Sequence, residues 1–390
     1  MYTTRRHDAV IRPFARLGTA GLVLLTALAT GCSAAAVSGG SAGSGGSGSP
    51  SPTAPGPMVL RSQEAREIFQ DYADTKAAAD AALDDASIRM VQTGPLLAES
   101  LAQYAVARKS GTALPLAGYR NPTFLIPDTR NGEGYPRWFA SFSKREGRET
   151  DRTAEVHYFV QERPGSPWRA AVGGSALTGP EPAPPLPPSV RYEEFAAPLP
   201  DTRYPQDVVR PGTAMLPALD RAAAGAIRMS GSAAADRRVC DTLAASLTTT
   251  VPGEPSPAAV AADREFASGP FTTGLRSYAV GLSGDGLRRD YTYRATDAGL
   301  PVFRLESGGS LVMCTLTRDH RVSTPGGERT VAFTAGSDTD VLLGGGSFRR
   351  VDQRGSVNAL VELPAGQGEP ATVLSGNGYD PQILSATGVR

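Results

Sequence analysis

The chain contains the segment Glu155-Val156-His157-Tyr158-Phe159-Val160-Gln161, in which apolar residues recur with a period of two. Val156, Tyr158 and Val160 occupy every second position. This spacing predicts a β-strand with one face towards a core, because successive side chains in a strand point to opposite faces. The other face has mainly polar residues, namely Glu155, His157 and Gln161. We expect it to contact water, as one face of an antiparallel sheet commonly does.

The neighbouring segments extend this strand into a meander. Residues 138–144 alternate in the same way, with Trp138, Ala140 and Phe142 opposite Ser141 and Ser143. A turn at 163–167 contains Pro-Gly and leads into a strand at 168–172, and a short strand is predicted at 124–126. These segments predict an antiparallel sheet.

Helices are predicted before the meander. Residues 60–83 have apolar positions at helical spacing, and a second helix begins at Pro95 and ends near Gly111. The second half repeats the order, with a helix over 236–249 and a partly helical stretch over 261–280. Its strands are predicted at 287–295, 302–306, 311–318, 330–333, 357–363 and 372–374.

A proline-rich segment, 178–211, separates the halves. It favours extended polyproline geometry and predicts an interdomain connector, with a ligand for an aromatic groove as the alternative. The predicted fold class is α+β, with two tandem domains at 58–177 and 212–390. Each is expected to pack helices on a curved antiparallel sheet.

The order of elements, with a Pro-Gly turn leading to Trp168, resembles the cone-shaped α+β fold of nuclear transport factor two and ketosteroid isomerase. The resemblance covers 60–175 and, more loosely, 213–390. It is an analogy at the level of the fold, so it implies an enclosed pocket on the inner sheet face and no particular activity.

The N-terminus predicts export. Four arginines within residues 1–16 precede an apolar run at 17–30, which is too short to span a bilayer comfortably. The run ends at Leu28-Ala29-Thr30-Gly31-Cys32. This motif resembles the lipobox of bacterial lipoproteins, although a larger residue is usual at Ala29. The resemblance implies that residues 1–31 are a signal peptide and that Cys32 carries lipid, with an ordinary secretory signal as the alternative.

Residues 32–57 are rich in Gly, Ser and Pro and predict a flexible tether with a reach of roughly 25–30 Å. The predicted location is therefore the extracytoplasmic side of the cell membrane. Removing residues 1–31 takes away four arginines and one acid, so the neutral precursor becomes a chain of charge −3. No basic block indicates nucleic acid as a partner. The whole chain resembles the uncharacterised secreted lipoproteins of streptomycetes.

Two cysteines remain after lipidation of Cys32. Cys240 and Cys314 would lie in an oxidising compartment, where an even number of cysteines favours a disulfide. The bridge would close a loop of about 75 residues. Two separately buried thiols are the alternative.

The sequence offers little for catalysis. No zinc, P-loop or dinucleotide motif occurs in a suitable context, so neither a metal nor a cofactor is expected. His157 is the strongest candidate for acid–base chemistry, against the alternative of a histidine on a wet sheet face. His320 is expected to be exposed. Asp338-Thr339-Asp340 begins like a calcium loop but lacks its later ligands.

Aromatic residues gather in the first meander: Trp138, Phe139, Phe142, Tyr158, Phe159 and Trp168. They are expected to form a core, although some could line an apolar ligand cavity.

Three hypotheses about function follow. The first is a non-catalytic lipoprotein of the cell envelope that binds another protein or the cell wall. The second is a carrier of a small apolar ligand, and the third is an isomerase or hydrolase that uses His157. The sequence favours them in this order.

Overall fold

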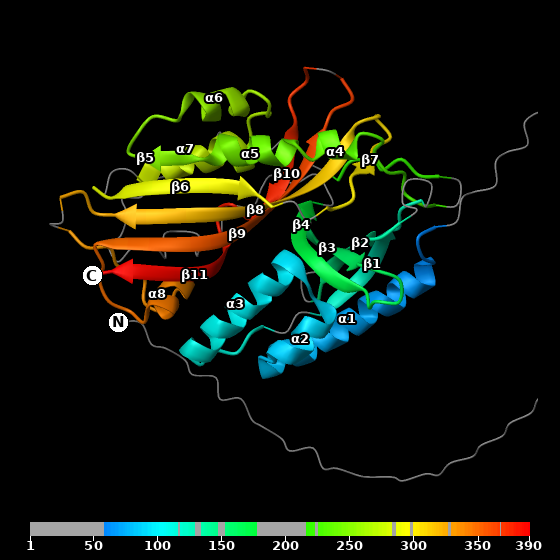
Figure 1. Cartoon of the computed structure of the whole chain (residues 1–390), viewed down its shortest axis with the longest axis horizontal. Helices are drawn as coiled ribbons and strands as arrows, with labels where there is room; N and C mark the ends of the chain where they lie inside the picture. Colours follow the sequence, from blue (N-terminus) through cyan, green and yellow to red (C-terminus); the bar gives the residue numbers. More distant parts are fainter. Residues whose placement is uncertain are drawn as a thin grey trace, which may run out of the picture. The chain divides into compact units, whose positions relative to one another are not determined.

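The predicted meander is a four-stranded antiparallel sheet with the order β1-β2-β3-β4 in the computed structural model (Figure 1). Its strands are β1 (Tyr119–Leu125), β2 (Arg137–Arg145), β3 (Thr153–Gln161) and β4 (Arg169–Leu177). Three helices precede it: α1 (Ser62–Ala82), α2 (Asp85–Val91) and α3 (Gly94–Ser110).

The structure describes residues 58–115, 118–128, 134–146, 153–177, 216–222, 225–282, 286–296, 299–326, 329–366 and 368–390. The predicted signal peptide, Cys32, the tether and the whole proline-rich connector lie outside these residues. No helix in the described ranges is long and apolar enough to cross a membrane.

Local signals explain where the helices begin and end. Leu83 adopts a left-handed conformation after α1, and the Asp84 side chain then accepts a hydrogen bond from the Ala86 amide at the start of α2. The sequence did not predict this seven-residue helix. Pro95 lies in the first turn of α3, and Gly111 ends that helix with φ +68°, which glycine adopts without strain.

Both faces of the first sheet are buried. The face with Val156 and Tyr158 packs towards the second half of the chain, as its apolar pattern predicts. The opposite face, which carries His157 and Phe159, is covered by α1–α3. The prediction that one face of this sheet is exposed to solvent is therefore wrong, because the preceding helices cover the face that carries the polar side chains.

The second half forms a seven-stranded antiparallel sheet with the main order β10-β9-β8-β6-β5. Two further strands, β11 and β7, pair with β9 and β8. The strands are β5 (Thr249–Val251), β6 (Arg288–Ala295), β7 (Phe303–Arg304), β8 (Ser310–Ser323), β9 (Arg350–Leu363), β10 (Thr372–Gly376) and β11 (Gln382–Val389).

The helical elements of this half are α4 (Ala233–Asp236), α5 (Val239–Leu247), α6 (Pro257–Asp263), the π-helical turn η3 (Pro270–Gly274), α7 (Leu275–Gly281) and α8 (Asp338–Leu343). Helices α5 and α7 contribute to the core on one face of the sheet. One predicted strand needs correction, because residues 330–333 make a single bridge, from Val331 to Phe348, and no strand. Asp338 begins a helix that Ser337 caps.

The two sheets share one hydrophobic cluster. The ring of Tyr158 on β3 stacks on Phe303 on β7, with ring centroids 6.1 Å apart. At Gly174 on β4, an added Cβ would lie only 3.0 Å from the Met313 side chain on β8, so glycine allows the sheets to approach. The α+β class is confirmed, and two sheets support two units, which pack against each other through this cluster.

The predicted disulfide is confirmed. Cys240 on α5 is bonded to Cys314 on β8, and their Cα atoms lie 5.2 Å apart. Both residues belong to the core between the helices and the second sheet. The bond therefore fastens α5 to the centre of this sheet.

We predict that replacing both cysteines, in a Cys240→Ser and Cys314→Ser double variant, lowers the free energy of unfolding. The expected loss is about 2–5 kcal/mol, because the bridge closes a loop with a sequence separation of 74 residues. Urea unfolding of the oxidised and variant proteins measures the difference. Equal midpoints, or free thiols at both positions in a non-reducing peptide map, would contradict the prediction.

Candidate functional site

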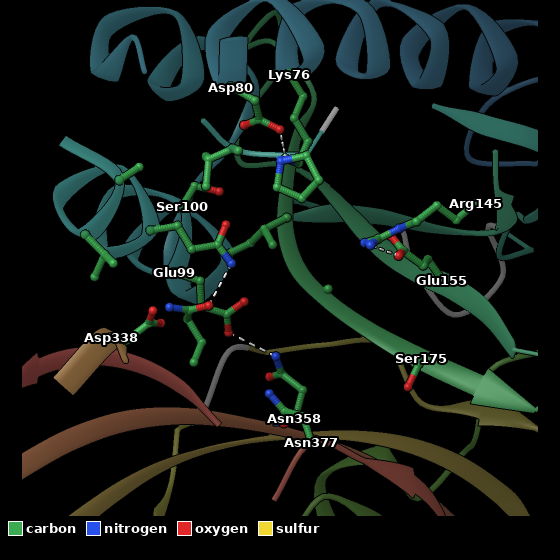
Figure 2. Close-up of a pocket in the computed structure, with 18 of the residues that line it drawn as sticks. Lys76, Asp80, Glu99, Ser100, Arg145, Glu155, Ser175, Asp338, Asn358 and Asn377 are labelled. Atoms are coloured by element: carbon green, nitrogen blue, oxygen red, sulfur yellow. Dashed lines mark hydrogen bonds and ion pairs between the residues drawn. The ribbon is translucent and has the colours of Figure 1, made fainter. Parts of the chain in front are cut away.

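A cavity of about 590 Å³ lies where the first three helices meet the two sheets. Its walls come from α1, α3 and the first sheet, and from β9, β11 and the start of α8 on the other side (Figure 2). Seven ionisable side chains with acid, base or imidazole groups contribute to the lining: Lys76, Asp80, Glu99, Arg145, Glu155, His157 and Asp338. The cavity therefore combines ionisable and aliphatic side chains from segments that are far apart in the sequence.

Helix α3 positions the most distinctive carboxylate. Glu99 Oε1 accepts hydrogen bonds from Ser356 Oγ at 2.6 Å and from Asn358 Nδ2 at 3.0 Å, both on β9. Burial raises the pKa of Glu99, and the two hydrogen bonds only partly offset this effect. One turn further along α3, Gln103 donates a hydrogen bond to Gln382 on β11 at 2.7 Å. Helix α3 thus contacts the second sheet mainly through polar groups that border the cavity.

Two ion pairs hold the basic groups of the cavity wall. Lys76 Nζ lies 2.5 Å from Asp80 Oδ2, one turn along α1. The other oxygen of Asp80 accepts a hydrogen bond from the Tyr104 hydroxyl at 2.8 Å. Arg145 on β2 forms an ion pair with Glu155 on β3. Both basic residues that line the cavity therefore have an acidic partner within the protein.

His157 lines the cavity from the centre of β3. The side chain is only 4% exposed and lies between aromatic rings, with the Tyr72 and Tyr119 centroids each 5.3 Å from the imidazole. Burial lowers its pKa to about 3, and the nearby charges of Lys76 and Arg145 act in the same direction. The interpretation of His157 as a histidine on a solvent-exposed sheet face is wrong, because α1 covers this side chain.

Nδ1 of His157 has no hydrogen-bond partner among the described residues. The same holds for Oδ1 of Asn358, whose side chain is 5% exposed and also lines the cavity. A buried polar atom without a partner costs free energy. The hydrogen-bonding capacity of these two atoms is therefore not satisfied within the described residues.

His320 belongs to a different environment. Its ring stacks on Tyr291 with centroids 4.2 Å apart, and Nδ1 is 2.7 Å from Gln353 Oε1. The expected exposure of His320 is wrong, since its side chain is 1% exposed beneath its neighbours on β6 and β9. It does not line the cavity, so the two histidines of the described chain are not brought together.

The six aromatic residues of the first meander contribute to hydrophobic clusters. The cavity lining includes none of them, and Tyr119 on β1 is its one aromatic residue besides His157 within the described ranges. The predicted core role is confirmed. The alternative of an apolar cavity lined by these rings does not fit this cavity.

Sequence reasoning did not single out Glu99, Asn358 or Arg145. Glu99 and Gln103 are four residues apart on α3, which places them on one helix face. Such a pair is usually solvent-exposed, and only the packing of α3 against β9 and β11 shows otherwise. Within the described ranges, no three His, Cys, Asp or Glu side chains are grouped as a metal site would require, and Asp338 shows no calcium loop.

Residues 57–186 match the sequence model of a family described as Domain of unknown function (DUF8094). The match covers about a third of the chain and includes α1–α3 and β1–β4, which carry much of the cavity wall. No curated protein gives a significant match to the chain. No solved structure gives a significant match either.

We predict that His157 makes the protein sensitive to acid. Because its folded pKa of about 3 lies below the ordinary value of 6.5, the unfolded chain binds its proton first, and stability falls as the pH drops through this interval. At pH 5 the loss from this residue is about 2 kcal/mol.

The measurement compares the free energy of unfolding at pH 7 and pH 5 in the wild type and in His157→Phe. The variant should lose less stability on acidification. His320, whose pKa is also lowered by burial, acts in the same direction and remains in both proteins, so it cancels. Equal pH dependence in the two proteins would show that His157 is not buried as a neutral imidazole.

Proposed function

We propose that this chain is a lipid-anchored extracytoplasmic protein that binds a small polar molecule without changing it chemically. The observation that supports the proposal is the cavity of about 590 Å³, whose wall carries seven ionisable side chains. Ligand sites of small molecules commonly have volumes in this range. Some of these groups, such as His157 and Asp80, are buried at the wall, which costs free energy unless they are paired, and a ligand that pairs with them offsets this cost.

The character of the wall favours a polar ligand over an apolar one. A carrier of an apolar ligand would be expected to surround it with aromatic and aliphatic side chains. Here the aromatic residues of the meander pack into the cores, and carboxylates, amides and hydroxyls border the cavity together with aliphatic side chains such as Leu96 and Val106. We therefore prefer the binding hypothesis to the apolar carrier.

An isomerase or hydrolase that uses His157 is the weaker alternative. A general base works best when its pKa lies near the working pH. With a pKa of about 3, the imidazole of His157 is a poor proton acceptor at neutral pH. It is better suited to accept or donate a hydrogen bond in its neutral form.

The proposed location rests on the sequence of the N-terminal segment. Lipid on Cys32 and the tether that follows would hold the cavity near the outer side of the membrane, where a small molecule from the surroundings can reach it. The family match at 57–186 begins at the end of this tether.

We predict that Cys32→Ala moves the protein from the membrane fraction to the soluble fraction of its host. Lipid on this residue would be its membrane anchor, since acyl chains provide the binding energy. Fractionation followed by immunoblotting measures the distribution, with Cys240→Ala as the control that leaves Cys32 intact. Continued membrane retention of Cys32→Ala would contradict lipid anchoring.

We also predict that the intact protein, purified gently from its own host, carries a small molecule that native mass spectrometry detects. The added mass should disappear on denaturation. It should be lost or reduced in Ser110→Trp, which places a large ring at the cavity wall, and retained in Ser62→Trp on the exposed start of α1. An unliganded mass for the wild type, or an adduct retained equally in both variants, would contradict the proposed site.

A further inference from the structure

The charges on the cavity wall do not balance. Two basic side chains face four acidic ones: Lys76 and Arg145, against Asp80, Glu99, Glu155 and Asp338. Lys76 pairs with Asp80, and Arg145 pairs with Glu155. The carboxylates of Glu99 and Asp338 remain without a basic partner among the described residues, so the wall has a net charge of −2 when all six groups are ionised.

Both of these carboxylates are held in surroundings that disfavour their charge. Burial raises the pKa of Glu99. Burial also raises the pKa of Asp338, and the neighbouring negative charge of Asp380 adds to the effect. A positive group placed between them would remove this penalty, because an opposite charge nearby stabilises the ionised form of an acid.

The polar atoms that lack partners point to the same kind of ligand. Both hydrogen bonds to Glu99 go to Oε1, and no hydrogen bond to Oε2 occurs within the described chain. Asn358 uses its amide nitrogen to hold Glu99, and its buried carbonyl oxygen has no donor among the described residues. In Figure 2, Glu99 and Asn358 lie together in the pocket, with Asp338 nearby. Two acceptors at one end of the cavity call for a hydrogen-bond donor.

We propose that the cavity recognises a small organic cation whose protonated amine binds between Glu99 Oε2 and Asn358 Oδ1. This inference rests on the proposed binding function and adds the chemical class of the ligand. An ammonium group has three donors and no acceptor, which matches two unused acceptors on a negative wall. Binding of an ammonium group does not require a cluster of metal-binding side chains.

The rest of the wall suits a ligand with further polar groups. Gln103, Gln382 and Asn377 border the cavity with amides, and Ser175 adds a hydroxyl. Such groups form hydrogen bonds with the hydroxyls and amides of a ligand as donor or as acceptor, because each amide side chain both donates and accepts. An amino sugar combines these features with one positive charge, and it serves as the test molecule.

The experiment measures binding of two matched probes to the full-length protein by isothermal titration calorimetry at pH 7. Glucosamine carries the ammonium group, and N-acetylglucosamine carries a neutral amide on the same sugar. Spermidine is included as a cation of different shape. We expect at least one of the two cationic probes to bind and the neutral sugar to bind at least tenfold more weakly.

Glu99→Gln provides the decisive variant. Glutamine keeps an oxygen that can accept from Ser356 and Asn358 but removes the charge, so binding of the cation should weaken roughly tenfold to a hundredfold. Glu67→Gln makes the same chemical change on the exposed face of α1 and should bind as the wild type does. Urea unfolding controls for folding, and Glu99→Gln should be at least as stable as the wild type because it removes a poorly solvated charge.

The outcomes separate this inference from the proposed function. Equal binding of glucosamine and N-acetylglucosamine, unchanged binding in Glu99→Gln, or no binding of either cationic probe would overturn the cation proposal. The proposed function is tested independently by the adduct of the host-purified protein. A neutral or anionic adduct would keep the binding function and reject the cation.

Discussion

The burial of both faces of the first sheet is the constraint on which the rest of the structure depends. A four-stranded sheet with one apolar face needs a single partner layer. Here α1–α3 cover one face and the second sheet covers the other. Polar side chains that an ordinary antiparallel sheet would present to water, such as His157, are thereby enclosed. The cavity lies beside these groups, between α1, α3 and the two sheets.

Helix α3 contacts both the first sheet and the second sheet. It packs on the first sheet through apolar residues such as Leu96 and Tyr104. Its contact with β9 uses Glu99, whose carboxylate is held by two side chains of that strand. A hydrophobic contact at this place would stabilise the fold with less cost. A buried acid that is held in position and has one unused oxygen is better explained by recognition of a ligand than by stability.

The sequence was sufficient for the parts of the fold that depend on local pattern. The alternation in 155–161, the helix end at Gly111 and the pairing of Cys240 with Cys314 are all confirmed. It failed where distant segments determine the outcome. The residues next to His157 and His320 in the sequence do not indicate which elements cover these side chains, and both were expected to be solvent-exposed. Short elements such as α2, α8 and β11 were also not predicted, because few residues carry the apolar periodicity of each one.

The candidate site could be predicted only in part for the same reason. His157 was singled out from the sequence, and it does line the cavity. Glu99, Asn358 and Asp338 come from α3, β9 and α8, and only the packing of these elements brings them around one space. The ionisable side chains of the wall also bear on the hypotheses about function. They weaken the apolar carrier, which depended on aromatic residues that now belong to the cores.

A crystal structure of the protein, purified from its own host without exposure to added small molecules, would show directly whether the cavity holds a ligand. We expect density for an organic molecule in the cavity, with a donor atom within about 3 Å of Glu99 Oε2. A cavity that contains only water, or one closed by direct contact of α3 with the second sheet, would contradict this expectation.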